Sequence, residues 1–427
     1  MKVVIMAGGK GTRISSVAAD IPKPMIRIAD RPVLEHQILH LKEQGLTDIT
    51  LITGHLGNVI RDYFGDGSKW GVSITCYQEE EPLGTAGALY YFKDVLKEDF
   101  LLMNGDIMAD IDFSRLICFH RERSAQATLF THPNHHPYDS ALIVADNEGK
   151  VTRWIHKEEQ RMRYKNRVNA GIHILSPILL EDIKKPEKLD LDRDILKPLV
   201  KQGVVYAYDS PEYVKDMGTP ERYQMVCEDY EKGKIAARNL SREQKAIFLD
   251  RDGTLNKYIG FLTKPEQLQL LDGVAEAVKR INESGYLAIV VTNQPVVARG
   301  DCSIEELEEI HNQLETELGN KGAYVDDIFF CPHHPDKGFE GERPEYKIDC
   351  ECRKPKPGML QKAAEKYHID LKNSYMVGDS IRDVQAGQAA GCHAVFVGEE
   401  DDLSKHETAQ DVKIYPDLLS FVKEKIK

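Results

Sequence analysis

The sequence lacks the features of three large protein classes. Only eight of its 427 residues are cysteine, far below the density of a disulfide-stapled secreted scaffold. No apolar run approaches the roughly 18 residues of a membrane span, and residues 3–7 are too short for the core of a signal peptide. The 56 Lys and Arg are outnumbered by 69 Asp and Glu, which excludes nonspecific nucleic-acid binding through a basic face. We therefore expect a cytoplasmic protein with neither a nucleic-acid nor a membrane partner.

Length and composition indicate a globular protein of two domains. The chain is about three times as long as the usual 100–150 residues of one domain, and it is 41% apolar and 29% charged. Two short apolar runs, 1–7 and 246–249, are each followed by a polar loop and open the two halves. The stretch 231–245 between the halves is polar. We expect a first domain over 1–232, a linker over 233–244 and a second domain over 245–427.

Helix and strand patterns alternate in both halves. This alternation predicts the α/β class, with each domain a mainly parallel sheet flanked by helices and with its ligand site at the carboxyl ends of the strands. The predicted helices cover 32–43, 274–284 and 382–390 and begin at 304 and 358, and the predicted strands cover 49–53, 286–291 and 375–377.

A glycine-rich loop follows the first strand. Gly8, Gly9 and Gly11 let backbone amides approach an anion closely, and Arg13 and Lys23 can neutralise a polyphosphate. By themselves the glycines are equally compatible with a surface turn, because short glycine motifs are weak signals.

The pattern extends well beyond the glycines. Five ordered segments covering about 1–230 resemble the signature of the sugar-1-phosphate nucleotidyltransferases: 8–13 with 21–25, 82–87, 102–106, 168–172 and 216–220. The resemblance implies a Rossmann-like domain in which a sugar 1-phosphate oxygen attacks the α-phosphorus of a nucleoside triphosphate and pyrophosphate leaves. The first of these segments is most similar to D-glycero-D-manno-heptose 1-phosphate guanylyltransferases, which implies GTP as the donor.

The same resemblance assigns roles to individual residues. It places Arg13 at the leaving pyrophosphate, Lys23 at the α-phosphate and Lys157 at the sugar phosphate, although His156 stands where the family has an acid. Mg²⁺ would bind Asp106 and Asp216, hard oxygen ligands that suit this cation. The other implied substrate-binding residues are Gly8, Gly9, Gly11, Thr12, Gly84, Thr85 and Asn169.

The second half opens with two carboxylates after an apolar strand, and this opening resembles that of haloacid-dehalogenase-type (HAD) phosphatases. Asp250 would attack phosphorus, and Asp252 would protonate the leaving oxygen and then activate water. Later motifs supply Thr292 as a donor to the phosphoryl group and Lys354 to neutralise its charge. The resemblance also implies Mg²⁺ on Asp250, Asp252 and Asp379, with Asp383 in the same acidic motif, and a substrate contact from Asn293. Arg299 and Arg353 are candidates for binding a second anion of the substrate, and solvated surface is the alternative for both.

A Cys-x-His and a Cys-x-Cys pair lie in the loop 331–352. Cys331, His333, Cys350 and Cys352 are a ligand set that suits a closed, structural Zn²⁺ site, and three buried cysteines without a metal are the alternative. A family of small phosphatases carries the same arrangement, which favours His333 over His334 as the ligand. Zinc would then position Lys354 without taking part in the chemistry.

The second half resembles both heptose 1,7-bisphosphate phosphatases and histidinol-phosphate phosphatases, except that Pro295-Val296 replaces the usual Ser-Gly. The hypothesis that joins both halves is a bifunctional enzyme: it dephosphorylates heptose 1,7-bisphosphate and transfers a nucleotidyl group, GMP from GTP, to heptose 1-phosphate. One alternative is another sugar nucleotide (dTDP-, UDP- or ADP-) with a histidinol-phosphate-like or hexose-phosphate phosphatase. Another is a noncatalytic, nucleotide-sensing first domain.

Partners outside the reaction are not indicated by any motif. The expected partners are nucleoside triphosphates and sugar phosphates, and a homo-oligomer is compatible with the sequence. His135, His136 and the basic stretch 161–167 are assigned no role, and we expect them to be solvated surface.

Overall fold

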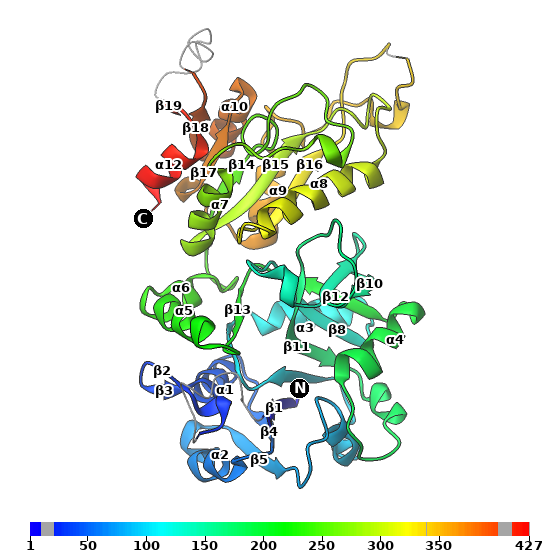
Figure 1. Cartoon of the computed structure of the whole chain (residues 1–427), viewed down its shortest axis with the longest axis vertical. Coiled ribbons are helices and arrows are strands. Elements are labelled where there is room, and N and C mark those ends of the chain that lie inside the picture. The colour runs from blue at the N-terminus through cyan, green and yellow to red at the C-terminus, as the bar shows by residue number, and fades with distance from the viewer. Residues whose placement is uncertain (10–20, 339, 400–411, 427) are drawn as a thin grey trace. The chain divides into compact units, whose positions relative to one another are not determined.

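The computed structural model describes residues 1–9, 21–338, 340–399 and 412–426, and the chain divides into two compact units (Figure 1). Unit 1 comprises Met1–His132, Ile143–Ile155 and Val168–Asn239. Unit 2 comprises Pro133–Leu142, His156–Arg167 and Leu240–Lys427. Both units combine parallel strands with helices, so the α/β class predicted from the sequence is confirmed.

Unit 1 is built on a nine-stranded mixed sheet in the order β10-β9-β11-β6-β1-β4-β5, with β8 pairing β11 and β12. Strands β6, β1, β4 and β5 run parallel, whereas β11 runs antiparallel to β6 and to β8. Two pairs, β2-β3 and β7-β13, lie outside this sheet. The strands are β1 Val3–Ala7, β2 Arg27–Ile28, β3 Arg31–Pro32, β4 Asp48–Thr53, β5 Ser73–Gln78, β6 Phe100–Asn104, β7 Ile107–Asp110, β8 Ala127–His132, β9 Leu142–Ala145, β10 Val151–Ile155, β11 Val168–Leu175, β12 Val205–Asp209 and β13 Tyr213–Asp216.

Helix α1 of unit 1 buries one apolar stripe against this sheet. In α1, Leu34, Ile38 and Leu41 recur at helical spacing and pack in one core with Val3 and Ile5 of β1. The helices are α1 Val33–Glu43, α2 Gly57–Phe64, α3 Phe113–Glu122, α4 Lys197–Leu199, α5 Pro220–Glu231 and α6 Lys234–Ala237. Helix α6 lies inside the predicted linker 233–244, where Ile235 is buried in a cluster with Val226.

Unit 2 contains a six-stranded parallel sheet in the order β16-β15-β14-β17-β18-β19. Because the strands are parallel, all their carboxyl ends meet at one edge, and this edge carries Asp250 after β14, Asn293 at the end of β15 and Gly378 at the end of β17. The strands are β14 Lys245–Leu249, β15 Tyr286–Asn293, β16 Asp327–Cys331, β17 Tyr375–Gly378, β18 His393–Val397 and β19 Lys413–Tyr415.

Both faces of this sheet are covered by helices. Ile247 and Leu249 of β14 belong to a core with α7, α8 and α12, whereas Ala246 and Phe248 belong to a core with α9 and α10. This two-sided burial explains the continuous apolar run at 246–249. The helices are α7 Val274–Glu283, α8 Ile304–Gly319, α9 Gly358–Tyr367, α10 Ile381–Ala390 and α12 Leu418–Lys425. In the described part of the chain, no helix is long and apolar enough to cross a bilayer.

The expectation that 161–167 and His136 are solvated surface is wrong. Arg167 and Glu315 form an ion pair of 3.1 Å inside unit 2, and each side chain is only 3% exposed. Arg167 also donates to the carbonyl of Asp326 at 2.8 Å, and the backbone amide of Asn166 donates to Glu315 at 2.9 Å. Arg167, at the end of the basic segment, can be buried because a carboxylate on α8 compensates its charge.

This pair generates a stability prediction. Arg167→Met leaves the Glu315 carboxylate buried without its charged partner, which typically costs about 3–5 kcal/mol. We expect faster hydrogen–deuterium exchange in peptides of α8 and a lower urea midpoint. The matched control is Arg280→Met, which removes an arginine paired with the half-exposed Glu276 within α7 and should leave α8 protection unchanged. Unchanged α8 protection in Arg167→Met contradicts the prediction.

Candidate active sites in the two units

Unit 1 contains a cleft of about 920 Å³ at the carboxyl ends of β1, β4 and β6. Gly8 and Gly9 follow β1, and a Cβ on the neighbouring Gly54 would lie 2.8 Å from the carbonyl of Gly8, so the two loops touch through their backbones. The predicted residues that line this cleft are Gly8, Gly9, Lys23, Gly84, Thr85 and Asp106. The predicted Gly11, Thr12 and Arg13 lie outside the described residues.

Each of the two carboxylates predicted to hold Mg²⁺ in unit 1 has a cationic partner. Lys23 Nζ lies 2.9 Å from Asp106, and Arg222 donates to both carboxylate oxygens of Asp216 at 2.8 and 2.9 Å. The backbone amide of Met217 donates to the carbonyl of Asp106 at 3.1 Å, which brings the two acidic positions next to each other. Both carboxylates are partly exposed hard oxygen donors, so the donor chemistry fits Mg²⁺.

A bulge in β11 presents Asn169. The pairing of β11 with β8 shifts register between Asn169 and His173, and Gly171 between them has a φ of 73°, which favours glycine. The Asn169 amide donates to both oxygens of Asp192 at 3.1 and 3.2 Å. Burial and the neighbouring Asp190 raise the pKa of Asp192 to about 6. The sequence motifs did not include Asp192. This residue lies in the short π-helical turn Leu191–Leu196, which shows no recognisable hydrophobic periodicity.

The remaining predicted sugar-phosphate contact is Lys157. It lies in an exposed turn after β10, where the backbone amide of His156 donates to Glu159 at 2.9 Å. Its role stays a prediction. The cleft also contains Lys188, a cation that the sequence motifs missed.

In unit 2, Lys354 is the centre of the candidate site. Its buried ammonium lies 2.9 Å from Asp250 and 2.5 Å from Asp383, and it donates to the carbonyl of Val291 at 2.8 Å. Burial opposes this charge, but the two carboxylates outweigh burial and raise the pKa of Lys354. The side chain is therefore a fixed positive charge beside the predicted nucleophile.

Asp250, Asp379 and Asp383 offer carboxylate oxygens within 4.8 Å of one another. Burial, followed by the charge of Asp250, raises the pKa of Asp379 to about 6 and that of Asp383 to about 7. This crowding of negative charge around oxygen donors fits a divalent cation such as Mg²⁺. The crowding depends on Gly253, where a Cβ would lie 1.9 Å from Asp379 and φ is 87°.

Asp252 lies apart from this acidic group. Its carboxylate accepts hydrogen bonds from Arg251, Asn256 and Gln294. Burial raises its pKa, but the Arg251 charge and these hydrogen bonds outweigh burial and hold the pKa below its usual value. The sequence predicted Asp252 but none of its three partners.

Of the other predicted residues of unit 2, Asn293 and Arg353 support the loop that carries Lys354. The Asn293 amide donates to the carbonyl of Lys354 at 2.9 Å and accepts from its backbone amide at 3.0 Å. Arg353 donates to the carbonyl of His333 at 3.0 Å. Arg299 donates to Asp301 at 3.0 Å and lies over the ring of Phe261, and Thr292 accepts from Gln294 at 2.8 Å. Their predicted substrate contacts stay predictions.

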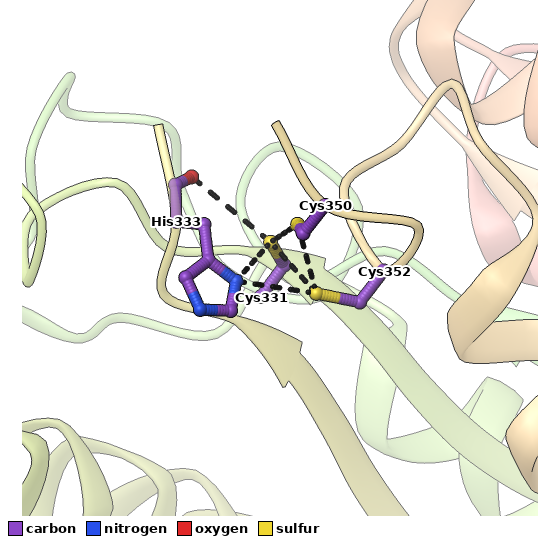
Figure 2. A group of neighbouring side chains, drawn as sticks. All are labelled: Cys331, His333, Cys350 and Cys352. Carbon is purple, nitrogen blue, oxygen red and sulfur yellow. Dashed lines mark hydrogen bonds between the residues drawn. The ribbon is translucent and has the colours of Figure 1, made fainter. Parts of the chain in front are cut away.

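Figure 2 shows the predicted zinc ligands pointing toward one another from the end of β16 and from a second loop. The sulfur–sulfur distances among Cys331, Cys350 and Cys352 are 3.1–3.4 Å, and His333 Nδ1 lies 3.4 Å from the Cys352 sulfur. Hydrogen bonds from the other two thiols lower the pKa of Cys352 to about 5. Three sulfurs and one imidazole form a donor set that fits Zn²⁺. His334 Nδ1 instead accepts from the amide of Asp336.

Comparison with known proteins assigns both halves. The profile of the Nucleotidyl transferase family matches residues 2–233, and a HAD-hydrolase-like profile matches 351–420. The 7-phosphatase for D-glycero-β-D-manno-heptose 1,7-bisphosphate from Pasteurella multocida is 44% identical over 147 residues, 34% of this chain and 77% of that protein. A probable mannose-1-phosphate guanylyltransferase from rice is 33% identical over 230 residues, 52% of this chain and 63% of that protein. The alignment thus spans less than two thirds of the rice relative.

A solved structure, HddC from Yersinia pseudotuberculosis, is 28% identical, with a TM-score of 0.47 over 54% of this chain and 99% of that one.

The two profiles define an enzyme with a nucleotidyltransferase domain and a HAD-like phosphatase domain. The chain belongs to the nucleotidyl transferase family over residues 2–233 and, through its second half, to the phosphatase family of the Pasteurella protein.

The cysteine cluster generates a metal prediction. We expect about one zinc per chain in the purified protein, measured by elemental mass spectrometry, because the four donors complete a tetrahedral set. Cys352→Ser should lose this zinc and lower the melting temperature. The control Cys392→Ser alters a buried cysteine outside the cluster and should keep the zinc. A zinc-free wild-type protein, or equal loss in both variants, contradicts the assignment.

Proposed function

We propose that this chain carries out two successive steps of nucleotide-activated heptose synthesis. The phosphatase half removes the 7-phosphate of D-glycero-D-manno-heptose 1,7-bisphosphate, and the nucleotidyltransferase half transfers GMP from GTP to the resulting heptose 1-phosphate. The observation that carries the proposal is the presence of both families on one chain, since the product of the first reaction is the substrate class of the second.

The phosphatase step uses the residues around Lys354. An Asp250 oxygen attacks phosphorus, the bond between phosphorus and the C7 oxygen breaks, and that oxygen takes a proton from Asp252. Water then attacks the aspartyl phosphate and gives its proton back to Asp252, which releases phosphate and regenerates Asp250. Lys354 neutralises charge on the phosphoryl group. Mg²⁺, when held by the neighbouring carboxylates, would reduce the repulsion between Asp250 and the substrate.

The transfer step uses the cleft of unit 1. The backbone of Gly8 and Gly9 and the ammonium of Lys23 hold the triphosphate, and the 1-phosphate oxygen of the sugar displaces pyrophosphate at the α-phosphorus. Mg²⁺ on Asp106 and Asp216 would stabilise charge on the reacting phosphates. The rice relative is named as a guanylyltransferase, which favours GTP over the other nucleoside triphosphates as the donor.

In the phosphatase half, structural zinc would hold the loop before Lys354 in place.

The test is one reaction analysed by mass spectrometry. It contains the full chain, Mg²⁺, both anomers of heptose 1,7-bisphosphate, and equal ATP, GTP, CTP, UTP and dTTP. A single GDP-heptose peak is the expected result. Heptose monophosphate without a nucleotide adduct contradicts the transferase assignment, untouched bisphosphate contradicts the phosphatase assignment, and another nucleotide contradicts the choice of GTP.

Two variants should separate the steps. Asp250→Asn removes the nucleophile and should slow phosphate release at least about a thousandfold, equivalent to about 4 kcal/mol of barrier. It should leave transfer to added heptose 1-phosphate intact. Asp106→Asn should have the reverse effect and accumulate heptose 1-phosphate. Each variant is the folding control of the other, and loss of both activities in either one contradicts the division of labour.

A further inference from the structure

The guanidinium of Arg251 is enclosed beside the predicted acid–base residue of the phosphatase site. Arg251 follows the nucleophile Asp250 directly and is completely buried. Its Nε lies 3.3 Å from Asp252 Oδ1 and its Nη2 lies 2.8 Å from Asp252 Oδ2. One rigid donor fork therefore contacts both oxygens of the carboxylate.

Two amides complete the arrangement. Asn256 donates to Asp252 Oδ1 at 2.9 Å, and Gln294 donates to Oδ2 at 2.8 Å. Gln294 also accepts from Arg251 Nη2 at 2.9 Å and donates to the hydroxyl of Thr292 at 2.8 Å. Arg251, Asp252 and Gln294 thus form a closed triangle of hydrogen bonds that extends to Thr292 at the end of β15.

The number of donors has a chemical consequence. A carboxylate has about four lone-pair positions, and four hydrogen bonds reach Asp252 here. These bonds fix the rotation of the carboxylate and the direction of each oxygen. A general acid must hold its proton within hydrogen-bond reach of the leaving oxygen, so the donors that fix its direction control the efficiency of proton transfer.

We propose that Arg251 is a positioning residue for proton transfer by Asp252. Gln294, which is hydrogen-bonded to both side chains, keeps Arg251 and Asp252 in a fixed orientation relative to each other. This rests on the proposed phosphatase mechanism. When substrate arrives, one amide donor withdraws, and the Asp252 oxygen that it leaves carries the proton and donates it to the leaving oxygen. The Arg251 guanidinium keeps the carboxyl group from turning. A lysine cannot take this role, because its ammonium is a single point donor without a planar fork.

The leaving group separates this role from a structural one. An alkoxide leaves slowly and needs a proton from Asp252 while the phosphorus–oxygen bond breaks, whereas 4-nitrophenolate leaves without it. The value of kcat/KM reports the steps up to aspartyl-phosphate formation. We compare heptose 1,7-bisphosphate and benzyl phosphate, which release alcohols, with 4-nitrophenyl phosphate.

Arg251→Lys should lower kcat/KM at least about tenfold for the two alkyl phosphates, which is part of the roughly 10²–10⁴-fold that general acid catalysis contributes as a whole. The loss for 4-nitrophenyl phosphate should stay below about threefold. Gln294→Leu should give the same selective loss at smaller magnitude, and it carries the test if Arg251→Lys does not fold. Asp252→Asn sets the upper limit of the effect.

The matched control is Arg167→Lys, which alters another buried arginine–carboxylate pair of unit 2 at the opposite end of the sheet. It should change kcat/KM for all three substrates by the same factor. Equal losses on alkyl and nitrophenyl substrates in both Arg251→Lys and Gln294→Leu, or no loss, overturn the proposal. If wild-type protein cleaves benzyl phosphate but not the bisphosphate, the proposed substrate is overturned. The role of Arg251 is then still tested by comparing benzyl phosphate with 4-nitrophenyl phosphate.

Discussion

The constraint on which the phosphatase half depends is the crowding of carboxylates at the carboxyl edge of its parallel sheet. In unit 2, three aspartates with oxygens within 4.8 Å of one another repel, and the buried ammonium of Lys354 lies against two of them. Such a cation is costly to bury alone and such carboxylates are costly to crowd, so each group depends on the other. The surrounding loops are arranged to keep Lys354 in this position.

The support of Lys354 extends to the cysteine cluster. Asn293 holds the backbone of Lys354 through two hydrogen bonds, and Arg353 donates to the carbonyl of His333. Cys352 lies two residues before Lys354, the proposed catalytic lysine, and belongs to the same loop. In unit 1, Asp106 and Asp216 are also each paired with a cation, Lys23 and Arg222 respectively. The acid–cation pairs leave oxygen donors accessible for a metal in both units.

Much of this arrangement follows from sequence. Asp250 and Thr292 each come at the end of a strand, and parallel strands bring such residues to one edge. The direction of the Arg251 side chain could not be predicted from the sequence. It depends on the turn at Gly253 and on a hydrogen bond to Gln294, which is 43 residues away in the chain. Basic stretches are usually solvated, so the sequence alone predicts a surface position for Arg167. Its partner Glu315 lies 148 residues away, beyond the reach of a local pattern. Asp192 was missed because an irregular turn brings it to Asn169.

The central claim is that the phosphatase half leaves intact the phosphate that the transferase half uses. Phosphorus NMR of heptose 1,7-bisphosphate, incubated with the full chain and Mg²⁺ but without any nucleotide, measures this directly. The account predicts that the 7-phosphate resonance is replaced by that of inorganic phosphate while the anomeric 1-phosphate resonance persists. Loss of the anomeric resonance, alone or together with the other, would contradict the account, because no substrate for nucleotidyl transfer would remain.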